Sequence, residues 1–396
     1  MPRLSDQRLA WMVGLLPEHR THPEVSLGEH FSHRVTALSR FVLARRRVYL
    51  DTRYWIFLRD AAMGRARRPI HSELFELLLR EVRAGTLVCP VGDSTFFELL
   101  RQLDPETRLA TARLIDALSL GVTIQNACDR LQTELVGFLV AVTKEQKIPG
   151  PPLERVWLKV GHVLGIAQPL FKGIDAAEQL AITKAFFDVM WSVTLEEQLT
   201  DTPLPENAPD AHFEDLAARI TVATKAHAAD VKEWNDVYLA EINGFFDVHR
   251  EEICAAFAQL HHLDRPNEQP ATAADFQQNE RVLVNVLTNI FRFGKAGTGL
   301  PTAQIVAGVH AIVRWHQQRP FAAHDFFDMY HATAALPYCD LFLTERFLGT
   351  ALTRPPLDMA KHFGTTVVWE EESALAAIQA LRGRSPRPVS DRRTTS

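Results

Sequence analysis

Four acidic residues stand where the elements of an α/β protein would bring carboxylates to one edge of a sheet. Asp51 and Glu345 each follow a short apolar run at once, whereas Glu98 and Asp328 lie on stretches with helical spacing. Close carboxylates repel one another unless they bind divalent cations, and oxygen ligands suit Mg²⁺ or Mn²⁺. We therefore expect these four acids to form a catalytic metal site of the kind that hydrolyses phosphodiesters.

Two of these acids also have a simpler interpretation. Asp51 would serve equally as a turn residue or as a helix N-cap. Glu98 has apolar neighbours on both sides and would then be a helix-surface residue. The acid that directly follows a buried strand, taken together with its three partners, favours the functional interpretation.

Short apolar, β-prone runs predict the strands that would position these acids. They alternate with helical stretches near both ends of the chain, and this order favours a parallel sheet with crossover helices. The carboxyl ends of parallel strands share one edge of a sheet, where ligands bind. The predicted strands are 48–50, 87–91, 121–124, 341–344 and 365–369.

The stretch between residues 126 and 320 shows only helical periodicity, so we expect a large all-helical insertion within an α/β core. We further expect the insertion to cap the carboxyl edge of the sheet and to restrict entry of nucleic acids. The expected parts are a helical extension at 1–45, a core at 46–126 and 321–382, the insertion at 127–320, and a disordered basic tail at 383–396.

The motifs around the four acids resemble those of the PIN-like nuclease superfamily. Three segments carry the resemblance: Tyr49–Thr52, Ser94–Leu99, and Asp328–Leu336 running into Phe342–Glu345. The resemblance covers about 46–126 and 321–382. It implies a three-layer α/β/α core and a metal-dependent ribonuclease, which in many relatives is a toxin or an RNA-processing enzyme. Structure-specific DNA nucleases share the wider fold.

The last acid departs from the family pattern. Relatives often carry it two residues after the threonine that ends the strand, where this chain has Arg346 after Thr344. Glu345 comes one residue earlier. Asp340 is a second nearby acid but precedes the strand, so it starts some distance from the carboxyl edge. The sequence leaves open which of Glu345 and Asp340 completes the acidic cluster.

Residues beside the acids are expected to contact the substrate. These residues are Thr52, Arg53, His331 and Thr344. His331 follows Asp328 by one helical turn and would orient a carboxylate or contact a phosphate, although a structural, hydrogen-bonded histidine is equally common. A basic rim would draw phosphates to an acidic cleft. Besides Arg53, it would comprise Arg59, Arg65, Arg67 and Arg68.

Competing motifs have less support. His324, Asp328 and His331 form one helical stripe that would hold zinc or iron, but no second ligand pair of similar quality stands out. The glycine-rich segment 294–299 lacks a preceding strand and the phosphate-loop order, so a loop between helices is expected there. No G-x-S-x-G element supports a serine hydrolase.

The composition of the chain indicates its expected partners and cellular compartment. The net charge of −5 gives no global attraction to nucleic acid or membranes, so polyanion binding needs a local basic patch. No apolar run reaches the roughly 18 residues of a membrane helix, and the four cysteines form no CxxC pair, so we expect a reduced, cytoplasmic protein without a structural zinc knot. RNA is the favoured partner. A DNA nuclease and a non-catalytic module whose insertion binds a protein remain as alternatives.

Overall fold

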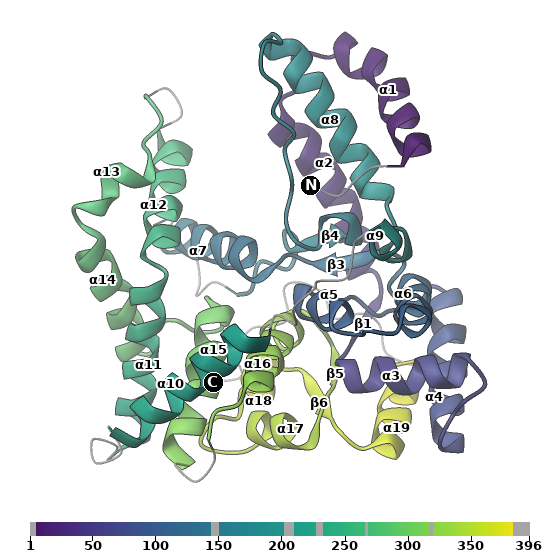
Figure 1. Ribbon diagram of the computed structural model, residues 1–396. Coiled ribbons are helices and arrows are strands. Elements are labelled where there is room, and N and C mark those ends of the chain that lie inside the picture. Colours follow the sequence, from purple (N-terminus) through teal and green to yellow (C-terminus); the bar gives the residue numbers. More distant parts are fainter. Residues whose placement is uncertain are drawn as a thin grey trace. The chain divides into compact units, whose positions relative to one another are not determined.

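Helices make up most of the chain, and four short strands pair in parallel, which makes this an α/β protein (Figure 1). The computed structural model describes residues 5–143, 150–201, 210–226, 233–265, 268–316 and 320–382. The chain forms two compact units. Unit 1 comprises Met1–Asn126, Leu153–Glu206 and Glu370–Pro386, and unit 2 comprises Ala127–Pro152, Asn207–Trp369 and Arg387–Ser396.

Unit 1 combines a small β-structure with two groups of helices. Its strands are β1 (Arg46–Leu50), β2 (Leu87–Val88), β3 (Val122–Ile124) and β4 (Trp157–Lys159). Its helices are α1 (Asp6–Thr21), α2 (Leu27–Leu43), α3 (Thr52–Ala62), α4 (Pro69–Arg83), α5 (Asp93–Leu100), α6 (Pro105–Ser119), η1 (Val160–His162), α8 (Ala176–Ser192), α9 (Leu195–Asp201) and α19 (Glu371–Leu381).

The strand β1 is buried along its whole length and lies parallel to β2, with Arg46 opposite Leu87 and Arg47 opposite Val88. Its β-branched and aromatic side chains suit a covered strand of this kind. The next strand along the chain after β2 is β3, which pairs antiparallel with β4. An isolated parallel bridge also joins Val91 to Thr123 of β3.

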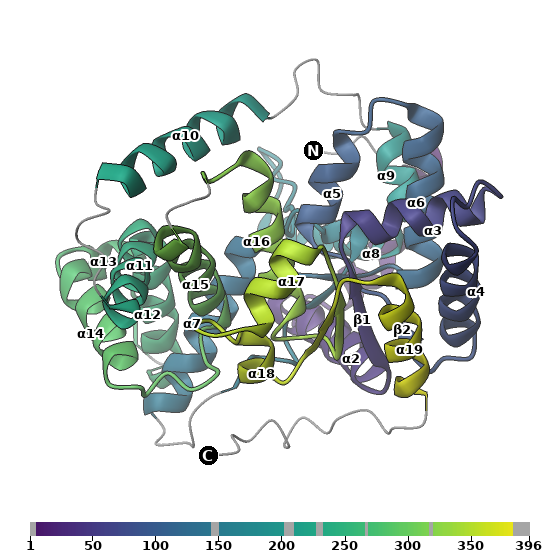
Figure 2. The ribbon, with the colours of Figure 1, turned by 90° about the horizontal axis from the view of Figure 1, so that it is seen from below.

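The two helix groups of unit 1 cover different parts of it. In the first group, α8 packs against α1 and α2 (Figure 1). Side chains cap all three N-termini, namely Ser5 for α1, Ser26 for α2 and Asp175 for α8. In the second group, α4 packs against α3, α6 and α19 (Figure 2).

Unit 2 contains the β5–β6 pair and most of the remaining helices. The strands β5 (Leu341–Leu343) and β6 (Thr366–Val368) are parallel. The helices are α7 (Ala127–Thr143), α10 (Asp210–Ala226), α11 (Trp234–Val248), α12 (Arg250–Asp264), α13 (Ala273–Gln277), α14 (Glu280–Arg292), α15 (Pro301–His316), α16 (Ala323–Ala335), α17 (Arg346–Thr353) and α18 (Met359–Phe363). Apolar faces of α7, α11, α12, α14 and α15 form one core around Phe138, Ile242 and Phe246.

The strands at 46–50, 341–343 and 366–368 lie where the sequence predicts them, and the segment 294–299 is a loop between α14 and α15. The strand at 122–124 joins Val91 through a parallel bridge, as expected, and it also pairs antiparallel with β4. One expectation was wrong, because β4 interrupts the stretch that was expected to be wholly helical. A buried strand of three residues, such as Trp157–Lys159, is too short to show a period of its own.

The expected boundary between residues 126 and 127 coincides with an edge of the two units, whereas those expected at 46 and 321 do not, and the expected division stays a prediction. The expected disordered tail at 383–396 lies outside the described residues. Among the described residues, no helix has both the length and the apolar character needed to cross a membrane.

Candidate functional site

Asp51 occupies the junction between β1 and α3. It is the N-cap of α3, and its carboxylate accepts a hydrogen bond from the backbone N–H of Tyr54 at 3.4 Å. The side chain is buried, with 4% of its surface exposed. The strand ends here because the capping conformation of Asp51 starts a helix at Thr52.

Thr52 links this junction to Glu98. The Thr52 hydroxyl donates a short hydrogen bond to the Glu98 carboxylate, which α5 presents half-buried. Thr52 is the first residue of α3 and follows Asp51 directly. The structure therefore brings Thr52 and Glu98 together beside Asp51, at the carboxyl end of β1.

A further acid, Asp93, lies at the start of α5. It is buried, and its carboxylate accepts a hydrogen bond from the backbone N–H of Ser94 at 3.0 Å. The Ser94 hydroxyl lies 3.4 Å from the hydroxyl of Tyr49 on β1. The N-cap of this helix is Gly92. Asp93 was not among the predicted site residues, and its place shortly after the second strand is the signal that could have found it.

The other two predicted acids belong to unit 2. Asp328 is half-buried on α16, one turn before the buried His331. Glu345 is exposed at the N-cap of α17 and makes no capping hydrogen bond with its side chain. Because Asp51 and Glu98 belong to unit 1, the convergence of all four acids stays a prediction.

The remaining unit 2 candidates lie around β5. Thr344 follows this strand, is buried, and donates its backbone N–H to the carbonyl of Val368 at 2.9 Å. Asp340 is buried just before the strand, and its backbone carbonyl accepts from Thr366 at 3.1 Å. His324, the first member of the proposed zinc stripe, has 63% of its side chain exposed.

The arginines of the expected basic rim are largely engaged by acids of unit 1. Arg53 and Arg68 both form ion pairs with Glu371 on α19, at 2.9 and 2.5 Å. Arg59 pairs with Asp60 at 2.6 Å. Such pairing neutralises much of the local positive charge that the sequence suggested.

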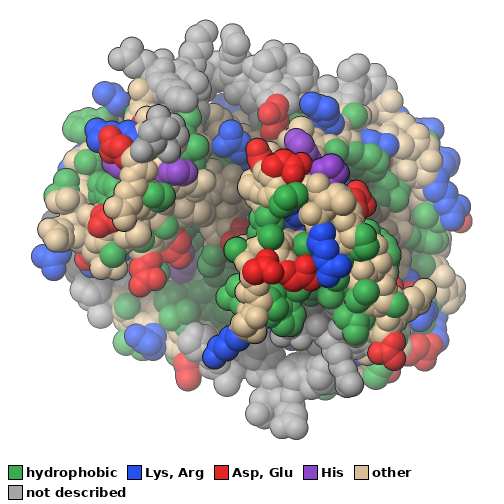
Figure 3. Space-filling model, turned by 90° about the horizontal axis from the view of Figure 1, so that it is seen from above, with side chains coloured by type: hydrophobic (Ala, Val, Ile, Leu, Met, Phe, Trp, Pro, Cys, Tyr) green, Lys and Arg blue, Asp and Glu red, His purple; other side chains and the backbone are tan. Residues whose placement is uncertain are grey.

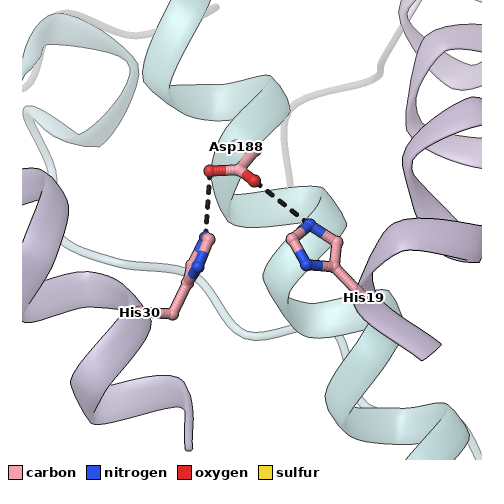
Figure 4. A group of neighbouring side chains, drawn as sticks. All are labelled: His19, His30 and Asp188. Atoms are coloured by element: carbon pink, nitrogen blue, oxygen red, sulfur yellow. Dashed lines mark hydrogen bonds and ion pairs between the residues drawn. The ribbon is translucent and has the colours of Figure 1, made fainter. Parts of the chain in front are cut away.

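Another cluster of polar groups, which the sequence analysis missed, joins α1, α2 and α8 within unit 1 (Figure 4). The Asp188 carboxylate lies 3.1 Å from Nε2 of His19 and 3.0 Å from Nε2 of His30. Burial lowers the pKa of His19. Burial also opposes ionisation of Asp188, but the hydrogen bond from His30 and the charges of His30, Arg34 and His19 lower the pKa of its carboxyl. These residues share no local spacing, so no motif marks them.

No protein-family model matches this chain, and no curated protein or solved structure matches it either. The resemblance to PIN-like nucleases therefore rests on the sequence motifs alone.

Proposed function

We propose that this protein is a metal-dependent nuclease that binds Mg²⁺ or Mn²⁺ through Asp51 and Glu98. The observation that carries the proposal is the hydrogen bond from Thr52 to Glu98, which sets a second carboxylate beside the buried Asp51 where β1 ends. The parallel pairs β1–β2 and β5–β6 agree with a PIN-like α/β/α core interrupted by a helical insertion, and the motif resemblance favours RNA over DNA as substrate.

The donor set suits a hard divalent cation. Asp51 and Glu98 supply carboxylate oxygens and Thr52 supplies a hydroxyl oxygen, and Mg²⁺ and Mn²⁺ prefer such ligands. When bound, the cation would activate a water and stabilise charge at a phosphodiester. The chain's own contribution is to hold the carboxylates in place, because the N-cap of α3 fixes Asp51 and the Thr52 hydroxyl orients Glu98.

Helix capping alone does not account for Asp51. Asp104 performs the same task for α6, accepting from the backbone N–H of Thr107 at 2.8 Å, and it does so while exposed to solvent. Burying an ionised carboxylate costs free energy that capping does not require. The burial of Asp51, together with the hydrogen bond from the adjacent Thr52 to Glu98, therefore supports a cation site here.

The test is cleavage of end-labelled RNA and DNA oligonucleotides of matched sequence, with added Mn²⁺. We expect Asp51→Asn and Glu98→Gln each to lower the cleavage rate at least about 100-fold, the scale of losing a group that stabilises transition-state charge. Asp104→Asn is the matched control, since it changes an N-cap aspartate outside the site, and it should cleave at the wild-type rate. Full activity of Asp51→Asn in a folded protein would overturn the proposal.

Two further sets of variants sharpen the result. Thr52→Val should lower the rate by a smaller factor than Glu98→Gln, and Thr52→Ser, which keeps the hydroxyl, should restore it. Asp328→Asn and Glu345→Gln decide whether these acids of unit 2 contribute, and the exposed Glu345 is expected to have the weaker effect. If neither RNA nor DNA is cleaved and Mn²⁺ does not bind, the α/β part of the chain is a non-catalytic module.

A further inference from the structure

The His19, His30 and Asp188 cluster has the ligand atoms of a transition-metal site. One atom from each residue can be chosen so that all three lie within 4.8 Å of one another. Around a tetrahedral ion with bonds of about 2.0–2.1 Å, neighbouring ligand atoms are about 3.3 Å apart. Oδ1 of Asp188 lies 3.0 Å from Nε2 of His30 and Oδ2 lies 3.1 Å from Nε2 of His19, so each imidazole is close to that spacing from one of the two carboxylate oxygens. Small side-chain adjustments would therefore accommodate an ion.

The side chains also point in the required directions. His19 and His30 extend from two different helices toward the same carboxylate on a third, each through Nε2 (Figure 4). Neutral imidazole nitrogen and carboxylate oxygen are the ligands of zinc and of related divalent ions, and three protein ligands leave a coordination position open. Mg²⁺ and Mn²⁺ prefer ligand sets made of oxygen atoms, so this cluster of two imidazoles and one carboxylate suits them less well.

A cavity of about 370 Å³ adjoins the cluster, and it is lined by all three of these residues. Trp11, Leu15 and Trp191 supply apolar parts of its wall, and Lys184 and His33 supply polar parts. In the space-filling view from above, histidine side chains lie next to acidic and basic ones (Figure 3). A ligand at an open coordination position would thus have room inside unit 1.

Arg34 provides the competing explanation for the buried carboxylate. Its guanidinium lies 2.9 Å from Asp188, so the ion pair already offsets part of the buried charge. However, 48% of the Arg34 side chain is exposed, compared with 7% for Asp188. Arg34 can therefore turn into solvent without leaving a buried cation, whereas His19 and Asp188 stay enclosed. A metal ion and Arg34 would compete for the same carboxylate.

We propose that His19, His30 and Asp188 bind a divalent transition-metal ion of the zinc type, with its open position facing this cavity. This site is separate from Asp51 and Glu98 and does not depend on the nuclease proposal. It differs in its ligands and in its preferred metal, so each proposal fails or stands by its own measurements.

The test is titration of tag-free, chelator-treated protein with Zn²⁺ by calorimetry and with Co²⁺ by visible absorption. Cys128 carries an exposed thiol, so the titrations use a Cys128→Ser background that removes a competing ligand. We expect one equivalent to bind and a Co²⁺ spectrum without thiolate charge-transfer bands. His30→Gln, His19→Gln and Asp188→Asn should each weaken binding beyond the 10- to 100-fold that losing a mere supporting partner costs.

Two variants serve as matched controls. His33→Gln removes an exposed histidine of the same cavity and should leave the affinity unchanged. Arg34→Gln removes the competing cation and should leave the affinity equal or raise it. Thermal melts without metal show which variants fold, and Zn²⁺ should raise the melting temperature of the wild type but not that of His30→Gln. Absence of saturable one-equivalent binding to the wild type, or equal loss in His33→Gln and His30→Gln, would overturn the proposal.

Discussion

Each unit of the molecule buries a carboxylate among polar partners, but the partners differ in kind. In unit 2, Glu134 accepts from the backbone N–H and the hydroxyl of Thr302 at 2.9 and 2.8 Å, and from the Tyr338 hydroxyl at 2.7 Å. In unit 1, Asp188 faces two imidazoles and a half-exposed arginine beside a cavity. Two hydroxyls and a backbone N–H donate to Glu134, whereas the groups facing Asp188 include imidazoles, whose neutral nitrogens are common metal ligands.

The charge environment differs in the same way. Burial raises the pKa of Glu134, and the opposing effects of Arg130, Tyr338 and Thr302 do not reverse the shift. At Asp188 the neighbouring cationic and hydrogen-bonding groups outweigh burial and lower the pKa of the carboxyl. A carboxylate such as Glu134, which is enclosed by fixed hydrogen-bond donors, stabilises the fold. A carboxylate such as Asp188, which faces a cavity and partners that can move away, is suited to bind a ligand. Four measurements test this distinction.

The largest effect is expected for Glu134→Ala. The change leaves Thr302 and Tyr338 with buried donors that have lost an acceptor, and leaves the fully buried Arg130 without its acidic neighbour 3.9 Å away. We expect the free energy of unfolding to fall by about 3–5 kcal/mol, as when one partner of a buried pair is removed. Denaturant titration measures the change. A loss below about 1 kcal/mol would show that the network does not hold unit 2 together.

A pH effect is expected from His162, which stacks on Phe187 of α8 with ring centroids 4.7 Å apart. Burial lowers the pKa of His162 to about 4, from the ordinary 6.5. Between these values the unfolded chain binds a proton that the folded chain does not. Above pH 6.5, the neutral His162 therefore contributes up to about 3 kcal/mol to the free energy of unfolding. This contribution is lost as the pH falls toward 4.

His162→Phe keeps an aromatic ring against Phe187 but cannot titrate. Comparing urea unfolding of this variant and the wild type between pH 4 and 7 isolates the contribution of His162. The wild type should lose more stability than the variant as the solution is acidified. Parallel curves for the two proteins would show that His162 takes up its proton equally in the folded and unfolded chains.

A smaller loss is expected for Asp188→Asn in metal-free protein. Arg34 can reach solvent, and burial lowers the pKa of His19 and so favours its neutral form, so the change leaves neither side chain as a buried cation. We expect the free energy of unfolding to fall by about 1.5–3 kcal/mol, the scale of one lost hydrogen bond to a charged group. If Asp188→Asn cost as much as Glu134→Ala, Asp188 would be a structural residue like Glu134.

The smallest effect belongs to a partly exposed ion pair of unit 2. Glu241 lies 2.9 Å from Arg314, and about a quarter of each side chain is exposed. Glu241→Gln should change the free energy of unfolding by less than about 1 kcal/mol, since water screens such pairs. A loss comparable to that of Glu134→Ala would mean that burial is not what separates the two carboxylates.

Sequence reasoning worked where the signal was local. The run Val48-Tyr49-Leu50 followed by Asp51 predicted a buried strand, and it also predicted an acid at the strand's end. β4 was not predicted because three residues are too few to show a periodicity. Its pairing with β3 depends on tertiary structure, which the local sequence pattern does not show. The arginines of the expected rim looked free because Glu371, the partner of Arg53 and Arg68, lies more than 300 positions away in the chain.

The cluster of His19, His30 and Asp188 could not be predicted from the sequence for the same reason. The two histidines lie on different helices, and the aspartate follows His30 by 158 residues. Their proximity depends on how α1, α2 and α8 pack, which no spacing in the sequence encodes. The expected convergence of Asp51 with Asp328 likewise depends on packing between distant segments, and it stays a prediction.

The packing of α1 against α8 also has a consequence for the order of events during translation. His19 leaves the ribosome 188 − 19 = 169 residues before Asp188 does. At synthesis rates of about 5–20 residues per second, the N-terminal helix waits roughly 10 to 30 s for its partner. Trp11 and Leu15, which later line the cavity, have no α8 to pack against during that interval. During that interval α1 exposes to solvent the face that α8 later covers.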